Sequence, residues 1–179
     1  MMKNSRSKLI SKYQYIGFLP NSVRIKENGY WGINDFEGNE ILPSNFIEVF
    51  TLSSGYGLIA ARDAGYWKIY DFEGNQINSK NFDIIYPYYG MFGMTKVKIG
   101  NRWGLINKFG KLIIPVEYKK IERFGKGLVL YNNNSKLEFI EKKDLIKLTS
   151  LKNSFIPSRI KKSIGKRNPS IVTKQKKTI

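Results

Sequence analysis

Residues 29–42 read GYWGINDFEGNEIL, and residues 65–77 read GYWKIYDFEGNQI, so the chain carries nearly the same phrase twice. A third version, RWGLINKFGKLII, follows at residues 102–114. The same interval of 36 residues separates three tryptophans and three glycines, which are Trp31, Trp67, Trp103, Gly38, Gly74 and Gly110. Self-similarity at a fixed period is the signature of a repeat protein.

Each repeat is predicted to be a small antiparallel meander of three strands. Short apolar segments alternate with turns at Gly or Asn, which tolerate the positive φ that tight hairpins need. Strand A is expected at residues 22–26, 57–62 and 94–99, and strand B at residues 30–36, 66–72 and 102–108. A less regular strand C is expected at residues 40–50, 76–86 and 112–122.

A degenerate fourth unit follows the three full ones. Its strands are expected at residues 127–132 and 136–142, with Leu137 near the position of the tryptophans. Loss of the aromatic residue is typical of a terminal unit, which has a neighbour on one side alone. The fold class predicted is therefore all-β, with three full meanders and one partial meander in a solenoid-like array. The alternatives are a small closed β-propeller and, third, a trefoil.

The first turn of each unit can be counted in two ways, and the count decides which face carries the tryptophans. A two-residue turn sets Lys26, Arg62 and Lys98 opposite the tryptophans, whereas a three-residue turn sets Ile25, Ala61 and Val97 there. We favour the three-residue turn, because it gathers aliphatic residues and tryptophans on one half-buried face. The tryptophans are then core residues, and a stacking platform for sugars or bases is the alternative. The other face would present cations to solvent.

The phrases GYWG, YWKIYDFEGN and RWGLINKFGKLIIPVEYKKIERF resemble WG repeats, a β-repeat of bacterial proteins. The third unit matches best, through Trp103, Gly104, Leu105, Ile106, Gly110, Lys111, Ile114, Pro115, Tyr118 and Phe124. The second unit departs, with Lys68 in place of the glycine and Asn78-Ser79 in place of Ile-Pro. The resemblance covers about residues 22–147. It implies an all-β array and no catalytic residues.

The composition argues against an enzyme. The sequence has no cysteine and no histidine, which removes disulfides, thiolate metal sites and the usual general base. Repeated acid pairs stand at Asp35, Glu37, Asp71 and Glu73, and turn formation explains them better than glycoside hydrolysis or calcium binding. The glycines have no P-loop spacing. We therefore expect no catalytic, cofactor or metal site.

The basic residues gather at the ends of the chain. Of 31 Lys and Arg residues, nine lie in residues 148–179, which contain no acidic residue, and the net charge is +17. We predict a basic lead at residues 1–16, a β domain at residues 17–147 and a flexible basic tail at residues 148–179. A targeting peptide is the alternative for the lead. No apolar run reaches the ~20 residues of a membrane span, so a cytoplasmic protein is expected.

Two non-catalytic functions remain open from the sequence, and an enzyme that uses carboxylate or Tyr/Lys chemistry is the third and least favoured hypothesis. The first is a non-catalytic module that presents a repeated β surface to a protein partner. The second is binding of a polyanion, either nucleic acid or an acidic surface. The candidate polyanion contacts are Arg24, Lys26, Arg62, Lys96, Lys98, Arg102, Arg159, Lys161, Lys162, Lys166 and Arg167. The loop YPYYGMFGM at residues 86–94 is a further candidate binding segment, against simple packing between units.

Overall fold

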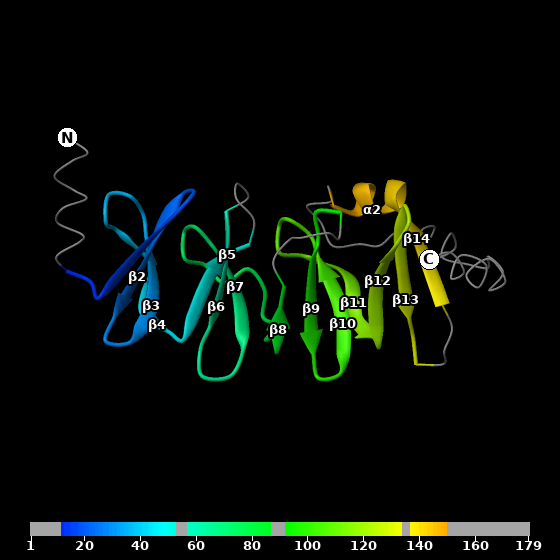
Figure 1. Ribbon diagram of the computed structural model, residues 1–179, viewed down its shortest axis with the longest axis horizontal. Helices are drawn as coiled ribbons and strands as arrows, with labels where there is room; N and C mark the ends of the chain where they lie inside the picture. Colours follow the sequence, from blue (N-terminus) through cyan, green and yellow to red (C-terminus); the bar gives the residue numbers. More distant parts are fainter. Residues whose placement is uncertain (1–11, 53–56, 87–91, 134–136, 150–179) are drawn as a thin grey trace, which may run out of the picture.

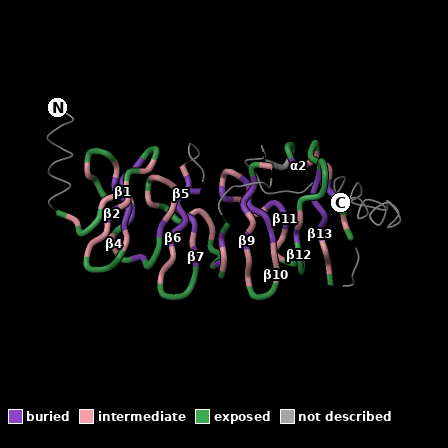
Figure 2. The backbone as a smooth tube through the Cα atoms, viewed as in Figure 1, coloured by how far each residue is buried: buried purple, intermediate pink, exposed green. Residues whose placement is uncertain are grey.

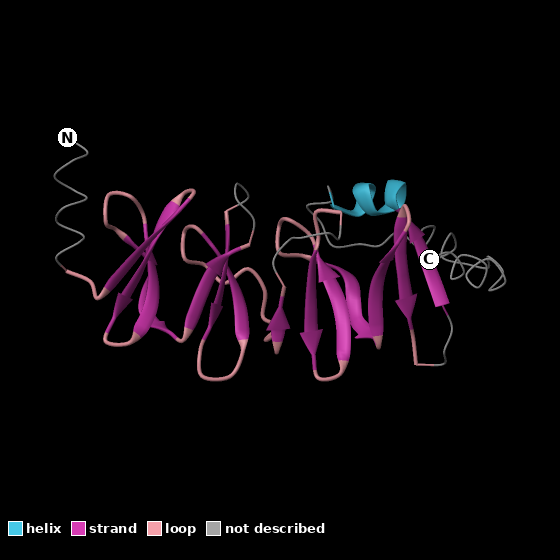
Figure 3. Cartoon of the chain, viewed as in Figure 1, coloured by secondary structure: helices cyan, strands magenta, loops and turns pink. Residues whose placement is uncertain are grey.

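The computed structural model describes residues 12–52, 57–86, 92–133 and 137–149 of the 179-residue chain. Over these residues the fold is all-β with one short helix (Figure 3). Four antiparallel sheets follow one another in chain order along the longest axis of the molecule (Figure 1). The row is open, so the predicted array of meanders is confirmed and the closed alternatives are not formed.

The sheets contain three or four strands each. The first consists of β1 (Tyr15–Leu19), β2 (Ser22–Glu27), β3 (Tyr30–Asn34) and β4 (Glu40–Phe46). The second consists of β5 (Glu48–Thr51), β6 (Leu58–Arg62) and β7 (Trp67–Asp71), and the third of β8 (Ile84–Ile85), β9 (Thr95–Ile99), β10 (Arg102–Ile106) and β11 (Leu112–Tyr118). The fourth consists of β12 (Lys120–Phe124), β13 (Gly127–Tyr131) and β14 (Leu137–Glu141), followed by helix α2 (Lys142–Thr149).

The predicted strand C was wrong as a single strand, because the chain turns a corner within it. Residues 40–46 form β4 at the edge of the first sheet, whereas residues 48–51 form β5 in the second. The backbone N–H of Ile47 already donates to the carbonyl of Arg62, 2.8 Å away in the next sheet. Lys119 repeats this corner by donating to Tyr131. Each repeat therefore supplies the first strand of the following sheet.

Strand β1 was not predicted from the sequence, and it takes this first-strand place in the first sheet. Strand β1 pairs with β2 along its whole length, from Tyr15 opposite Lys26 to Leu19 opposite Ser22. No earlier repeat precedes it in the sequence, so the period of 36 gave no indication of a strand there. The available signal was the alternating segment YIGFL followed by the turn residues Pro20 and Asn21.

The preferred three-residue turn was also wrong. The register sets Lys26 opposite Trp31, Arg62 opposite Trp67 and Lys98 opposite Trp103, as a two-residue turn requires. In the first unit both turn residues have positive φ, at 50° for Asn28 and 85° for Gly29, which is the type I′ pattern. The tryptophans and the cations therefore share one face of each sheet.

Stacking of the sheets explains why the expectation of one apolar face and one polar face in each sheet was wrong. An inner sheet is buried on both faces, because it packs against one neighbour on each side, so neither face needs to be polar. One apolar cluster joins the first and second sheets through Ile33, Leu42, Val49 and Ile59, and two further clusters join the second to the third and the third to the fourth. Figure 2 shows buried strand interiors between exposed turns.

The tryptophans lie at the margin of these interfaces. Trp67 is 8% exposed and belongs to the apolar cluster between the second and third sheets. Trp31 and Trp103 are half-buried and pack against the neighbouring clusters. Each tryptophan pairs with an aromatic residue of the following segment: Phe46 in β4, Tyr118 in β11, and Phe82 through an isolated bridge.

The repeated acidic positions form turns. Asp35 accepts from the backbone N–H of Asn39 at 2.7 Å, and Asp71 accepts from that of Asn75 at 2.7 Å. Asn107 takes the same place in the third unit and accepts from Lys111 at 3.0 Å. The glycines of these turns have φ of 94°, 83° and 74°, and they are Gly38, Gly74 and Gly110. The side-chain oxygens at these positions thus hold the turn that carries the repeat glycine.

The fourth unit agrees with the sequence prediction, since β13 and β14 lie within the expected ranges. Leu137 stands opposite Tyr131, as the tryptophans stand opposite Lys or Arg. Helix α2 follows, and its Leu145 is buried in the apolar cluster between the third and fourth sheets. None of the helices in the described residues is long and apolar enough to cross a membrane.

The glycine after the tryptophan allows a bulged strand to approach. A Cβ on Gly104 would lie 2.7 Å from the Ile114 carbonyl oxygen, and one on Gly32 would lie 2.8 Å from that of Leu42. The register of the partner strands shifts here, between Leu42 and Phe46 and between Ile114 and Tyr118. The second unit has Lys68 at the glycine position, and there the third strand is reduced to bridges at Gln76 and Phe82. Full pairing of this strand thus coincides with a glycine after the tryptophan.

We expect Gly104→Ala to lower the free energy of unfolding by about 2 kcal/mol, because the new methyl group would displace the β11 backbone. Urea denaturation followed by circular dichroism measures this change. The matched control is Gly65→Ala, since a Cβ at Gly65 meets nothing within 4 Å. Gly65→Ala should leave stability unchanged or raise it by up to about 1 kcal/mol. Equal effects of the two changes would contradict the close approach at Gly104.

Candidate binding surface

The turns β2–β3, β6–β7 and β9–β10 lie along one long edge of the array, the lower edge in Figure 1. We call this surface, with the tryptophans at the adjacent strand ends, the hairpin edge. Four tyrosines on it or beside its tryptophans are about half exposed: Tyr15 (49%), Tyr30 (49%), Tyr66 (48%) and Tyr86 (48%). Tyr30 and Tyr66 are 36 residues apart and occupy equivalent turn positions. Exposed tyrosine side chains thus recur along the hairpin edge.

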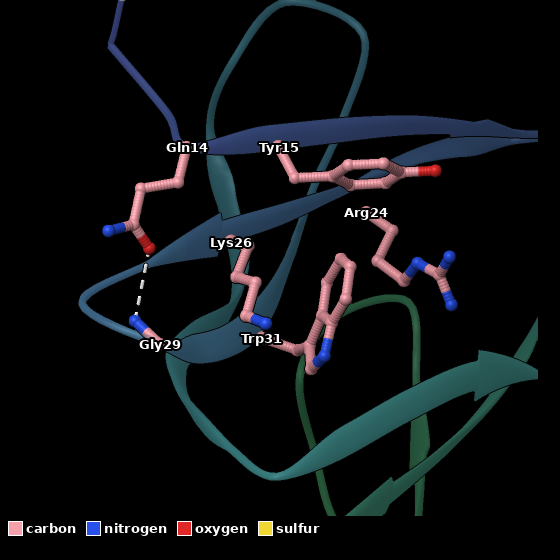
Figure 4. A pocket seen from close by; sticks show the side chains of 6 residues that line it. All are labelled: Gln14, Tyr15, Arg24, Lys26, Gly29 and Trp31. Atoms are coloured by element: carbon pink, nitrogen blue, oxygen red, sulfur yellow. Dashed lines mark hydrogen bonds between the residues drawn. The ribbon is translucent and has the colours of Figure 1, made fainter.

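A cation–indole cluster surrounds Trp31 in the first sheet. The Arg24 guanidinium carbon lies 4.4 Å from the centroid of the indole, and the Lys26 Nζ lies 5.1 Å from it. Tyr15 meets Trp31 edge to face, at 5.3 Å between centroids. These side chains line an open hollow of about 530 Å³ together with Gln14 and Gly29 (Figure 4). Gln14 closes one end by accepting from the Gly29 N–H at 3.1 Å.

The third sheet has an equivalent cluster around Trp103. The Lys96 Nζ lies 4.1 Å from the indole centroid and the Lys98 Nζ lies 5.4 Å from it. Tyr86 stacks on the indole at 5.8 Å, with an interplanar angle of 27°. Arg24 and Lys96 are 72 residues apart, and so are Lys26 and Lys98. The cations of the two clusters therefore occupy equivalent positions in the first and third repeats.

One cation of each cluster reaches across to the next sheet. Arg24 donates to the carbonyl of Val49, 3.5 Å away on β5, and Lys96 donates to the carbonyl of Ile121, 3.1 Å away on β12. Burial lowers the pKa of Lys96, the nearby Glu122 partly offsets this effect, and Lys120 adds a smaller lowering. Arg24 and Lys96 therefore hold neighbouring sheets together, in addition to contacting an indole.

The second sheet has a neutral version of the cluster. Ala60 stands where the other units have Arg24 and Lys96, and Phe50 packs edge to face on Trp67 at 4.9 Å. The remaining cation, Arg62, pairs with Glu48 at 3.3 Å. Nearby, Lys68 pairs with Asp63 at 2.7 Å, and this contact lowers the pKa of the Asp63 carboxyl. The charges of the middle unit are thus balanced.

The structure separates the six sheet cations that were candidates for polyanion contact. Arg24 and Lys96 turn toward the next sheet, Arg62 faces Glu48, and Arg102 donates to the Asn133 side chain. Lys26 and Lys98 have no carboxylate of the described residues within salt-bridge distance, so they are the most available for contact with an anion. The tail candidates Arg159, Lys161, Lys162, Lys166 and Arg167 lie outside the described residues.

The loop at residues 86–94 is described at its ends. Tyr86 contacts Trp103, and the Phe92 ring lies 4.8 Å from the Arg123 guanidinium carbon. Tyr88 and Tyr89 lie outside the described residues. Gln14 and Tyr15 were not predicted as surface residues, because they fall in the basic lead at residues 1–16 and β1 was not expected.

No group of three or more Asp, Glu, His or Cys side chains suited to a metal ion occurs among the residues that the structure describes. Asp35 and Asp71 are engaged in their turns, as given above. What the hairpin edge can offer chemically is positive charge beside aromatic rings, a combination that binds anionic and aromatic groups.

The sequence model of one protein family, the WG containing repeat, matches residues 103–136. This stretch begins at Trp103 and coincides with the unit in which the resemblance was strongest, so the resemblance is confirmed there. No curated protein sequence matches the chain.

Two solved structures show weak similarity. One is the crystal structure of the eukaryotic initiation factor, at 12% identity and a TM-score of 0.40, covering 71% of this chain and 40% of that one. The other is the computationally designed Ika4 protein, at 10% identity and a TM-score of 0.35, covering 70% of this chain and 88% of that one. The chain thus spans less than half of the initiation factor, and neither likeness bears on its function.

We expect Lys96→Met to lower the free energy of unfolding by about 1 kcal/mol at neutral pH, because it removes the bond to the Ile121 carbonyl. The loss should grow as the pH rises toward 10.5, the ordinary pKa of lysine. Burial lowers the pKa of Lys96 in the folded protein, so above that lowered value the unfolded chain binds more protons at this group, and folding gains stability with pH. Urea titrations of both proteins over this range measure the difference, and a constant difference would contradict it.

Proposed function

We propose, from the repeat that residues 103–136 match, that the chain is a non-catalytic binding module whose hairpin edge receives a protein partner. The observation that carries the proposal is the repeated pairing of half-exposed tyrosines with cation–indole clusters on that edge. Tyr, Trp and Arg are enriched at the centres of protein interfaces, where they account for most of the binding energy.

Three features of the surface support a protein as the ligand. Arrays of similar units make extended recognition surfaces, and the row of sheets provides one. Tyrosine supplies a large contact area at low entropic cost, because it has two side-chain torsions. The indoles are anchored between sheets, so the surface is formed before a partner arrives. The lack of His and Cys in the sequence favours binding over catalysis.

Affinity purification with the full chain tests this function. We expect the wild-type chain to retain a protein at near-stoichiometric amounts, and the triple variant Tyr15→Ser, Tyr66→Ser, Tyr86→Ser to bind that protein about tenfold more weakly or worse. The control replaces Phe36 and Phe124 with Ser, since these rings are similarly exposed (42% and 40%) in or beside turns on the opposite edge. Absence of any stoichiometric protein, or equal retention by the tyrosine variant, would reject the proposal.

A polyanion is the second candidate ligand. It is favoured by Lys26 and Lys98, which lie over indoles without a carboxylate partner among the described residues.

If this candidate is right, affinity for duplex DNA should fall linearly with the logarithm of salt concentration, as counterion release requires. Lys26→Gln combined with Lys98→Gln should reduce that slope by about two, because two phosphate contacts are lost. A chain without residues 148–179 separates the contribution of the basic tail. No binding at low salt would exclude nucleic acid as the ligand.

A further inference from the structure

The charge of the hairpin edge alternates from unit to unit, although the sequences of the units are similar. The first unit offers Lys26 over Trp31 and the third offers Lys98 over Trp103, and neither cation has a carboxylate partner among the described residues. Between them, the second unit pairs Arg62 with Glu48 and Lys68 with Asp63. Glu27 stands beside the first turn and Asp83 accepts from the Gly100 N–H at the third, but both outer units have more cations than carboxylates there. The edge is therefore net positive, then balanced, then net positive.

This pattern suits separate carboxylates better than a phosphate backbone. A nucleic-acid strand carries a charge at every nucleotide and binds best to a continuous track of cations. Here a continuous strand would pass Glu48 and Asp63 in the middle unit, which are exposed or half-buried carboxylates. A protein segment can place acidic residues at the two ends and neutral residues in the middle, so it matches the charge at every unit.

The spacing of the two clusters sets the length of such a segment. The clusters lie two sheets apart in the row (Figure 1), and stacked sheets are ~10 Å apart, so the two lysines are separated by about 20 Å. An extended chain rises ~3.3 Å per residue, which gives about six residues between the acidic positions.

Each cluster is built to hold a carboxylate. The ammonium nitrogen of Lys26 or Lys98 lies over an indole, and this contact restricts the side chain and reduces the entropy lost when it pairs with an anion. Arg24 or Lys96 adds a second positive charge beside the same ring. At Trp31 these groups border the open hollow, so a carboxylate side chain can enter between them (Figure 4).

We infer that the hairpin edge recognises an extended acidic protein segment, with one carboxylate at the Lys26–Trp31 cluster and a second, about six residues away, at the Lys98–Trp103 cluster. The inference rests on the proposed function and specifies the partner chemistry. Exposed Tyr66, between the two clusters, contacts the neutral middle of the segment.

Two synthetic peptides of identical composition test the spacing with the full chain. One carries two Glu-Glu pairs about six residues apart, with Gly and Ser between them, and the other carries all four Glu together at one end. Fluorescence anisotropy of the labelled peptides gives both dissociation constants. The spaced peptide should bind at least about tenfold more tightly, because its second contact is intramolecular. Equal affinities, or no binding of either peptide, would overturn the inference.

Variants assign the binding to the two clusters. Lys26→Gln and Lys98→Gln should each abolish the preference for the spaced peptide, whereas Lys111→Gln and Lys126→Gln, in turns on the opposite edge, should preserve it. Tighter binding of a single-stranded oligonucleotide than of the spaced peptide would also overturn the inference. The proposed function is tested separately. If the tyrosine variant loses a protein partner but Lys26→Gln and Lys98→Gln both retain it, the hairpin edge still binds protein, but it does not recognise an acidic segment.

Discussion

Face-to-face packing of successive sheets is the constraint on which the structure depends. Each three-stranded or four-stranded sheet buries an apolar face against the next, and an inner sheet buries both. A single meander of this size has too little core to be stable, so the interfaces between sheets supply the stability. The corner at Ile47 or Lys119, which passes a strand to the following sheet, ties the covalent chain to this packing. The tryptophans lie at the rim of these interfaces, and this position brings their rings to the hairpin edge.

The same packing divides the cations into two groups, those that contact the next sheet and those that remain at the surface. Arg24 and Lys96 sit far enough along their strands to reach a carbonyl of the next sheet, whereas Lys26 and Lys98 sit beside the turn and remain at the surface. In the middle unit Ala60 and Phe50 remove the charge that the other clusters contain, and Glu48 balances Arg62. A nearly identical sequence phrase therefore produces a surface whose units differ in charge.

Much of the architecture could be predicted because it depends on local chemistry. The glycine turns, strands A and B, and the degenerate fourth unit all follow from positive-φ residues and apolar alternation over a few residues. Three features could not be predicted in this way. Strand β1 has no earlier repeat to match, the corner inside strand C depends on the next sheet, and the turn count was decided on the assumption of one buried face. Candidate cations were named correctly as residues, but their division between sheet contacts and surface required the positions of Val49 and Ile121.

The sequence by itself determined the period of 36, the all-β class and the resemblance to WG repeats, since turn residues and apolar spacing act over short stretches of chain. The tertiary structure decided which side of each sheet carries the indoles and which cations remain free. The physical reason is that an inner sheet is buried on both faces, so hydrophobic alternation no longer distinguishes them. The choice then falls to the two-residue turn at Asn28 and Gly29 and to the neighbour that each face meets.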